Sequence, residues 1–153
     1  MRLVSAAAIA ACVSVAAMAV PLTKDKALTV MKTRHDGMEA IGDAFKTLHR
    51  TLSGTPDLPT VRSNAAKIAQ LSHQASGWFP AGTGPDVAKT RAKPEIWQSP
   101  EDFESKLRNF QAAATAFNSA ARGNDVAAMN ARFGDLGGTC KACHDKYRAE
   151  EQH

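Results

Sequence analysis

The spacing of hydrophobic positions along the chain predicts four long helices. Met31, Met38, Phe45 and Leu52 recur every seven residues, with Ile41 and Leu48 at the intervening positions. This spacing is typical of an amphipathic helix over 24–52. Apolar positions at the same kind of spacing predict further helices over about 59–76, 100–122 and 126–150. Turn-forming residues at 53–56 and 123–125 separate these helices, and one longer irregular segment precedes the third helix.

These elements predict an all-α fold. Alanine is abundant and runs of β-branched residues are scarce, which favours helix over strand. The third helix has a well-marked start, with Ser99 as the N-cap, Pro100 at the first helical position and Asp102 completing a capping box. Because most connections are short, the four helices are expected to form an antiparallel up-down bundle.

The first residues have the features of a secretory signal peptide. Arg2 supplies a positive charge, an apolar stretch over 3–20 follows, and Ala17-Met18-Ala19 has the form of a cleavage site. We therefore expect residues 1–19 to be removed on export to the periplasm and residues 20–153 to form one domain without a membrane span. An uncleaved membrane anchor and lipidation at Cys12 are the two alternatives.

Composition and charge exclude few functions, but they argue against nucleic-acid binding. Hydrophobic residues make up 44% of the 153 residues and charged residues 22%, which are ordinary values for a globular protein. The formal net charge of +4 comes from basic residues spread along the chain rather than gathered in a run. No nucleophile, general base or substrate site is recognisable in the sequence, so we do not expect an enzyme.

The strongest chemical signal is Cys140-x-x-Cys143-His144, the pattern of a haem attachment motif. Cysteines three residues apart share one face of a helix, so both thiols can reach the two vinyl groups along one porphyrin edge. His144 follows directly and can bind the iron. A redox dithiol, a structural disulfide and half a zinc site are the alternatives, but a thioredoxin-like context and a second ligand pair are both missing. One covalently bound haem c is the prediction.

The chain resembles the class II cytochrome c family, which includes cytochrome c′. The resemblance rests on the export signal, the four-helix pattern, the C-terminal CKACHDKYR and the KPEIW segment before the third long helix. It extends to Arg34 followed four residues later by the position that faces the iron in this family. Members of the family are often homodimers, so the resemblance makes a homodimer possible.

Met38 occupies that distal position, and the resemblance implies two possible roles for it. In cytochrome c′ a bulky residue there leaves the iron five-coordinate, whereas in the low-spin branch a methionine binds the iron. We predict that Met38 is the second axial ligand, opposite His144. A methionine that only fills the core is the alternative from the sequence alone, and Met31 and His35 are rival ligands.

Arg34 lies at an otherwise apolar position, where an unpaired charge would be costly. A haem propionate is the expected counter-charge, as the resemblance also implies, and an arginine extending to solvent is the alternative. Together these residues predict a periplasmic electron carrier with His144 and Met38 ligation that docks weakly on redox partner proteins. The alternative function is a five-coordinate haem protein of the cytochrome c′ kind that binds nitric oxide or carbon monoxide.

Overall fold

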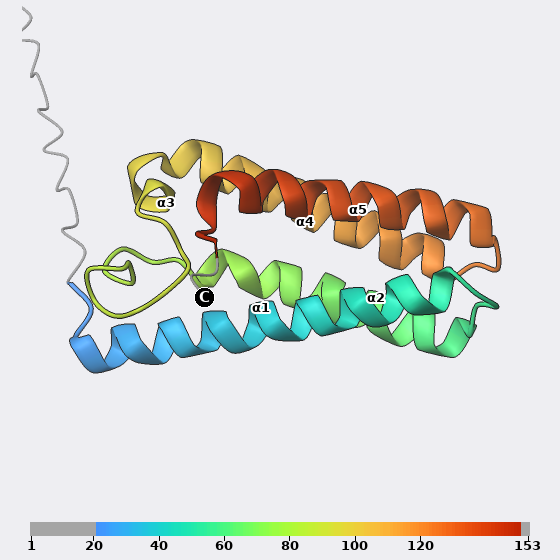
Figure 1. Cartoon of the computed structure of the whole chain (residues 1–153), viewed down its shortest axis with the longest axis horizontal. Helices are drawn as coiled ribbons and strands as arrows, with labels where there is room; N and C mark the ends of the chain where they lie inside the picture. The colour runs from blue at the N-terminus through green and yellow to red at the C-terminus, as the bar shows by residue number, and fades with distance from the viewer. Residues whose placement is uncertain (1–20, 151–153) are drawn as a thin grey trace, which may run out of the picture.

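The computed structural model describes residues 21–150 as an antiparallel bundle of four long helices (Figure 1). The long helices are α1 (Lys24–Leu52), α2 (Leu58–Gln74), α4 (Pro100–Ala121) and α5 (Val126–Tyr147). Successive long helices run in opposite directions, so the start of α1 and the end of α5 lie at the same end of the bundle. We call this end the motif end, because α5 carries Cys140, Cys143 and His144 towards it. The predicted all-α, up-down bundle is confirmed.

Two short elements flank the irregular segment 78–94 at the motif end. They are the 3-10 helix η1 (Ala75–Gly77) and the single-turn helix α3 (Glu95–Gln98). The segment pairs with the chain beyond α5, because Lys93 N–H donates to Tyr147 O at 3.0 Å and Ala149 N–H donates to Arg91 O at 2.8 Å. In this pairing the Ala149 N–H binds Arg91 O instead of a carbonyl one turn earlier in α5. The helix α5 therefore ends at Tyr147 rather than at the predicted residue 150.

The bundle core is formed by the apolar stripes that the sequence pattern predicts. The largest fully buried apolar side chains come from all four long helices and include Leu48, Ile68, Phe117, Met129 and Leu136. The closely packed pairs are α1 with α2, α2 with α4, and α4 with α5. Within residues 21–150, α1 and α5 are not among the closely packed pairs. Large side chains bridge them instead: the Phe45 and Phe133 rings stack with their centroids 4.4 Å apart.

Side chains cap the starts of α1 and α5, whereas the start of α4 departs from the sequence prediction. The Asp125 carboxylate accepts a hydrogen bond from Ala128 N–H at 3.0 Å and so caps α5. Thr23 caps α1 in the same way. Ser99 precedes α4 but its side chain makes no capping bond, and Asp102 points to α5 instead. The predicted capping box is wrong, because the Asp102 carboxylate is bound by a tyrosine hydroxyl and a lysine ammonium group.

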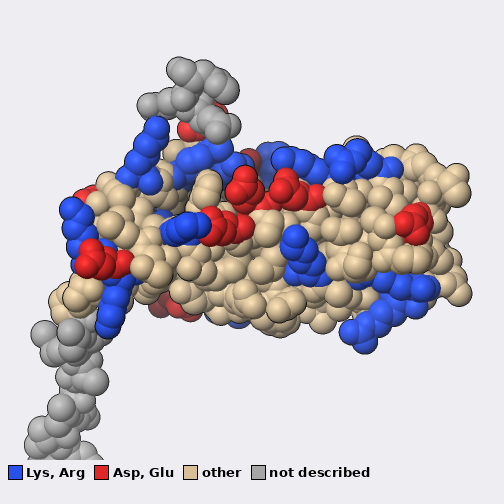
Figure 2. All heavy atoms as spheres, turned by 90° about the horizontal axis from the view of Figure 1, so that it is seen from below, with Lys and Arg blue, Asp and Glu red and all other residues tan. Residues whose placement is uncertain are grey.

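Charges of both signs are interspersed over the face of the molecule shown in Figure 2. Several form exposed pairs along one helix, such as Lys32 with Asp36 at 2.5 Å and Lys46 with Asp43 at 3.4 Å. Such pairs contribute little to stability. None of the helices between residues 21 and 150 combines the length and apolar composition that crossing a bilayer requires. The predicted signal peptide, residues 1–19, lies outside the described residues.

Candidate haem attachment site

The last two turns of α5 present both motif cysteines on the helix face that meets the core. Cys140 and Cys143 are free, half-buried, and packed against the apolar core. Burial raises the pKa of both thiols, that of Cys143 to about 11. The Cys140 sulfur and the Asp102 carboxylate also raise the pKa of Cys143, while Lys106 lowers it. Both thiols are therefore protonated at neutral pH.

His144 lies on the stripe of α5 that faces α1. It follows Gly137 by seven residues, nearly two full turns, so the two positions share one stripe of the helix. His144 is exposed at its surface. Partial burial lowers its pKa, as do the positive charges of Arg148 and Arg91, while Asp145 acts in the opposite direction. The neutral imidazole, which is the form that binds metals, is favoured.

The contact between α1 and α5 fixes which residue of α1 lies opposite His144. A Cβ atom at Gly137 would lie 3.2 Å from the Cζ atom of Phe45, so these two positions face each other. Met38 lies seven residues before Phe45, and His144 seven residues after Gly137. Because the helices are antiparallel and rise about 1.5 Å per residue, both steps cover roughly 10 Å in the same direction. Met38 and His144 therefore lie at the same level of the bundle.

Met38 has the surroundings expected of a residue that covers a group attached at the motif, on the side of that group that faces α1. It is partly buried and packed against the apolar core. Of the rival ligands, Met31 is buried and lies two turns closer to the start of α1. His35 is exposed, and its Nε2 atom lies 3.9 Å from a carboxylate oxygen of Glu39. The structure thus places Met38, rather than Met31 or His35, at the level of the motif.

Arg34 is almost fully buried, with 5% of its surface exposed, and it binds segment 78–94. Its terminal nitrogens donate four hydrogen bonds, to Trp78 O at 3.4 Å, Thr83 Oγ1 at 3.1 Å, Thr83 O at 3.0 Å and Thr90 Oγ1 at 3.2 Å. The guanidinium carbon also lies 5.1 Å from the centre of the Phe79 ring. These acceptors are all neutral. Desolvation by burial lowers the pKa of Arg34, and none of these four acceptors is a carboxylate that would offset this effect.

These side chains fit haem c. Two free thiols one turn apart match the two reactive positions along one porphyrin edge, and the adjacent imidazole is an iron ligand. The opposite face of such a group would meet the apolar stripe of α1 around Met38, where α1 and α5 are not closely packed. The buried positive charge of Arg34 suits an acidic substituent on the same group.

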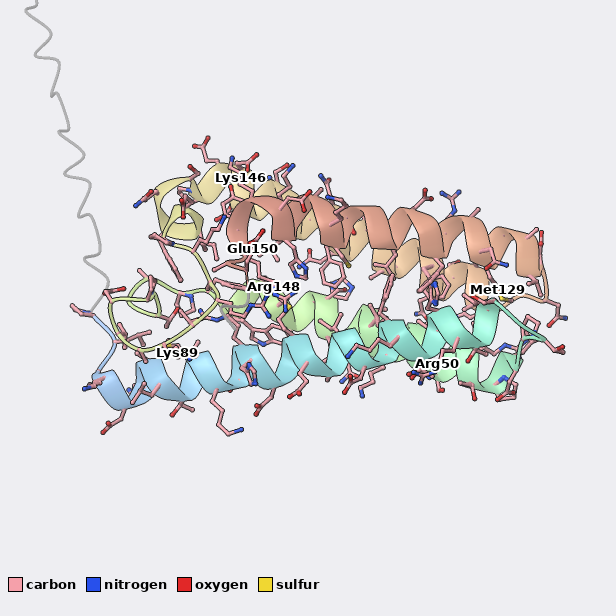
Figure 3. All side chains as sticks on the ribbon, viewed as in Figure 1. Arg50, Lys89, Met129, Lys146, Arg148 and Glu150 are labelled. Atoms are coloured by element: carbon pink, nitrogen blue, oxygen red, sulfur yellow. The ribbon has the colours of Figure 1, made fainter. Side chains whose placement is uncertain are left out.

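The sequence analysis did not identify the contacts that hold the end of α5. The Tyr147 hydroxyl donates to Asp102 Oδ2 at 2.5 Å, and Lys146 Nζ donates to the same oxygen at 2.9 Å. In Figure 3, Lys146 lies on the outer side of the end of α5 and Arg148 on the side towards α1. Asp102 lies in the first turn of α4 and Tyr147 at the end of α5. The sequence does not show that these two residues, 45 positions apart, are in contact.

Comparison with known proteins shows which family this chain belongs to. The family model described as Cytochrome C′ matches residues 29–148. The chain belongs to the cytochrome c′ family. The cytochrome c′ of Allochromatium vinosum is 34% identical over 123 residues, which cover 78% of this chain and 80% of that protein. Members of this family carry covalently attached haem c, so the cofactor prediction is confirmed.

Solved cytochromes c′ share the fold described above. One, notable for ligand-controlled dimer dissociation, superposes with a TM-score of 0.76 and 30% identity, covering 86% of this chain and all of that one. A nitric oxide complex of a variant of cytochrome c prime from Alcaligenes xylosoxidans superposes with a TM-score of 0.72 and 27% identity. That superposition covers 84% of this chain and 97% of the other.

The family assignment overturns one prediction. The relatives that match most of the chain are named cytochrome c′, so the prediction of the low-spin branch, and of an electron carrier with His144 and Met38 ligation, is wrong. The physical reason is that a methionine on the apolar stripe of α1 looks the same in the sequence whether its sulfur binds iron or only packs. The individual roles of Cys140, Cys143, His144 and Arg34 are not tested by these relatives and stay predictions.

Proposed function

We propose that this chain is an exported cytochrome c′ whose single haem c binds nitric oxide or carbon monoxide on the side facing α1. The observation that supports this most is the placement of Met38 at the level of His144, across a pair of helices that are not closely packed. Haem c held at this site would supply an iron atom that can bind a diatomic gas.

Cys140 and Cys143 are the attachment residues in this proposal. They would hold the haem through two thioether bonds, with the proton of each thiol passing to the vinyl carbon next to the one that the sulfur binds. Both thiols are half-buried against the core, so the group they hold would lie against the last turns of α5. His144 would hold the iron through its neutral imidazole.

Met38 would cover the side of the haem that faces α1 without binding the iron. Its thioether and the nearest buried positions of α1, Gly37 and Ile41, offer no side-chain hydrogen-bond donor and no charge, so water and anions gain little by entering. A small neutral gas loses nothing in the same surroundings. The side chain is flexible and can move aside for a diatomic molecule, because methionine has three rotatable bonds.

Arg34 is the counter-charge for the haem propionates in this proposal. Its four printed hydrogen bonds go to neutral oxygen atoms, so its positive charge has no carboxylate among those partners. A propionate near the guanidinium would supply the missing negative charge and offset the cost of burial. The same residue holds segment 78–94 against α1, which closes the motif end of the bundle.

The remaining features of the proposal concern the whole protein. Residues 1–19 direct export and are removed, and residues 20–153 form the periplasmic domain. Gas binding involves no bond chemistry in a substrate, so the protein acts as a binding module and not as an enzyme. A homodimer is part of the proposal, since a solved relative is named for its dimer dissociation.

Optical and electron paramagnetic resonance spectra of the purified holoprotein test the function. We expect high-spin signals from the ferric protein and carbon monoxide binding by the ferrous protein. Low-spin ferric signals together with no carbon monoxide binding would overturn the proposal. The ferrous Met38→Ala variant serves as a positive control, because removing the side chain leaves the distal side open whether or not Met38 binds iron.

A further inference from the structure

Asp102 connects the start of α4 to the last turn of α5. Its Oδ2 atom accepts hydrogen bonds from the Tyr147 hydroxyl at 2.5 Å and from Lys146 Nζ at 2.9 Å. The attachment motif requires neither bond. The hydroxyl–carboxylate bond is charge-assisted and short, so it restrains the rotation of the α5 end more firmly than a bond between neutral groups would.

The Tyr147 ring is fixed as well as its hydroxyl. The side chain is 2% exposed, and its ring packs edge-on against Phe103 with centroids 5.1 Å apart. Phe103 in turn packs against Phe79 of segment 78–94 at 4.8 Å. Such aromatic pairs favour one geometry over others. Tyr147 is therefore held at its ring by packing and at its hydroxyl by Asp102.

The backbone around Tyr147 is restrained from the other side. Lys93 N–H donates to Tyr147 O at 3.0 Å, and Arg148 N–H donates to His144 O at 3.0 Å. His144 precedes Tyr147 by three residues, less than one turn of α5. A rotation or shift of Tyr147 about the helix axis would therefore carry the His144 backbone and the base of its side chain with it.

We propose that Asp102 and Tyr147 are positioning residues for His144. The hydrogen bond between them fixes the rotation of the last turn of α5 and, through it, the orientation of the imidazole plane towards the porphyrin. This inference rests on the proposed role of His144 as the iron ligand. It does not depend on whether the opposite side of the iron takes up a gas.

The test compares holoproteins by proton NMR in the ferric state. The shifts of the His144 ring protons caused by the unpaired electrons depend on the orientation of the ring around its bond to iron. Tyr147→Phe removes the hydroxyl and keeps the ring packing, while Asp102→Asn removes the charge and keeps the shape. We expect both variants to move the His144 ring signals in the same direction, and the double variant to move them no further.

Amide hydrogen exchange provides a second measurement. Loss of one charge-assisted bond should speed exchange at the Arg148 and Ala149 amides by roughly tenfold, and leave the first turns of α5 unchanged. Asp135→Asn is the matched control, because it breaks an exposed pair with Arg132 at 3.1 Å on the same helix, more than two turns before His144. This control should change neither measurement.

Each outcome separates the alternatives. Faster exchange with unmoved His144 ring signals would show that Asp102 and Tyr147 only stabilise the packing of α4 on α5, and would overturn the inference. Unchanged exchange and unchanged signals would overturn it too. Moved ring signals in a protein that binds no carbon monoxide would support the inference and contradict the proposed function.

Discussion

The indole ring of Trp78 lies directly on the backbone of Gly37. A Cβ atom at Gly37 would be 2.2 Å from Cη2 and 2.5 Å from Cζ2 of the ring, closer than any real contact. Trp78 is buried, and it opens the segment that closes the motif end of the bundle. Gly37 is required because the indole ring leaves no room for a side chain. Its backbone conformation is helical and would suit any residue. This contact sets where the segment crosses α1, one residue before Met38.

Gly37→Ala should therefore destabilise the protein, although alanine is the better helix former. Overpacking against a rigid indole ring costs about 1–3 kcal/mol, and a lower thermal midpoint would show it. Gly42→Ala is the matched control in the same helix, because a Cβ there meets nothing within 4 Å. It should raise stability by about 0.5–1 kcal/mol. Equal stability of the two variants would contradict the close contact.

Arg34→Lys should weaken the attachment of segment 78–94 to α1. Lysine keeps the positive charge but cannot reach the two threonine hydroxyls and two carbonyl oxygens that the guanidinium binds. The buried acceptors then lose partners, at a cost of about 1–3 kcal/mol. Urea denaturation measures the loss, and limited proteolysis should show earlier cleavage within 78–94.

Arg50→Lys is the control for that experiment. Arg50 is exposed and donates to Thr47 on the same helix, so the replacement should change stability by less than about 0.5 kcal/mol. If Arg34→Lys were as stable as Arg50→Lys, the four hydrogen bonds of Arg34 would not hold the segment.

The sequence predicted the parts of this protein that depend on local pattern. The four apolar stripes gave the long helices, and the spacing of Cys140, Cys143 and His144 gave the cofactor. The rest depends on contacts between distant residues. Asp102 looked like a helix cap because the sequence does not show Tyr147 beside it. The role assigned to Met38 was wrong for a different reason, since packing and iron ligation require the same side chain at the same position.

The Asp102 contacts also predict how stability changes with pH. The hydrogen bonds from Tyr147 and Lys146 lower the pKa of the Asp102 carboxyl below its ordinary value. A lowered pKa in the folded state means that the unfolded chain binds the proton more readily. The contribution of Asp102 is therefore complete above the ordinary carboxyl pKa of about 4 and is lost as the pH falls through the lowered value.

Thermal unfolding at a series of pH values checks this expectation. Asp102→Asn should be less stable than the parent protein at neutral pH, and the difference should shrink as the pH falls below about 4. Asp145→Asn provides the comparison for a carboxylate on the exposed side of α5. A constant difference between Asp102→Asn and the parent from neutral to acidic pH would show that the carboxylate charge is not what stabilises this contact.

The two motif cysteines predict a stepwise loss of haem attachment. Cys140→Ala and Cys143→Ala should each leave one thioether bond, and the double variant should leave none. Extraction with acidified organic solvent should then remove haem from the double variant alone. The pyridine haemochrome spectrum counts the remaining bonds, because each free vinyl group shifts the main band to longer wavelength. Haem retained by the double variant after extraction would show attachment elsewhere.

Met38→Ala tests the side of the haem that faces α1. If Met38 covers an open iron without binding it, the ferric spectrum should stay high-spin and carbon monoxide should bind the ferrous protein faster, because the obstruction is gone. Met31→Ala is the control, since Met31 is a buried methionine of the same helix two turns away. Its loss should cost about 2–5 kcal/mol of stability and leave the binding rate unchanged. A faster rate in both variants would point to loosening of α1 as a whole. A faster rate in Met38→Ala alone would assign control of gas access to that one side chain.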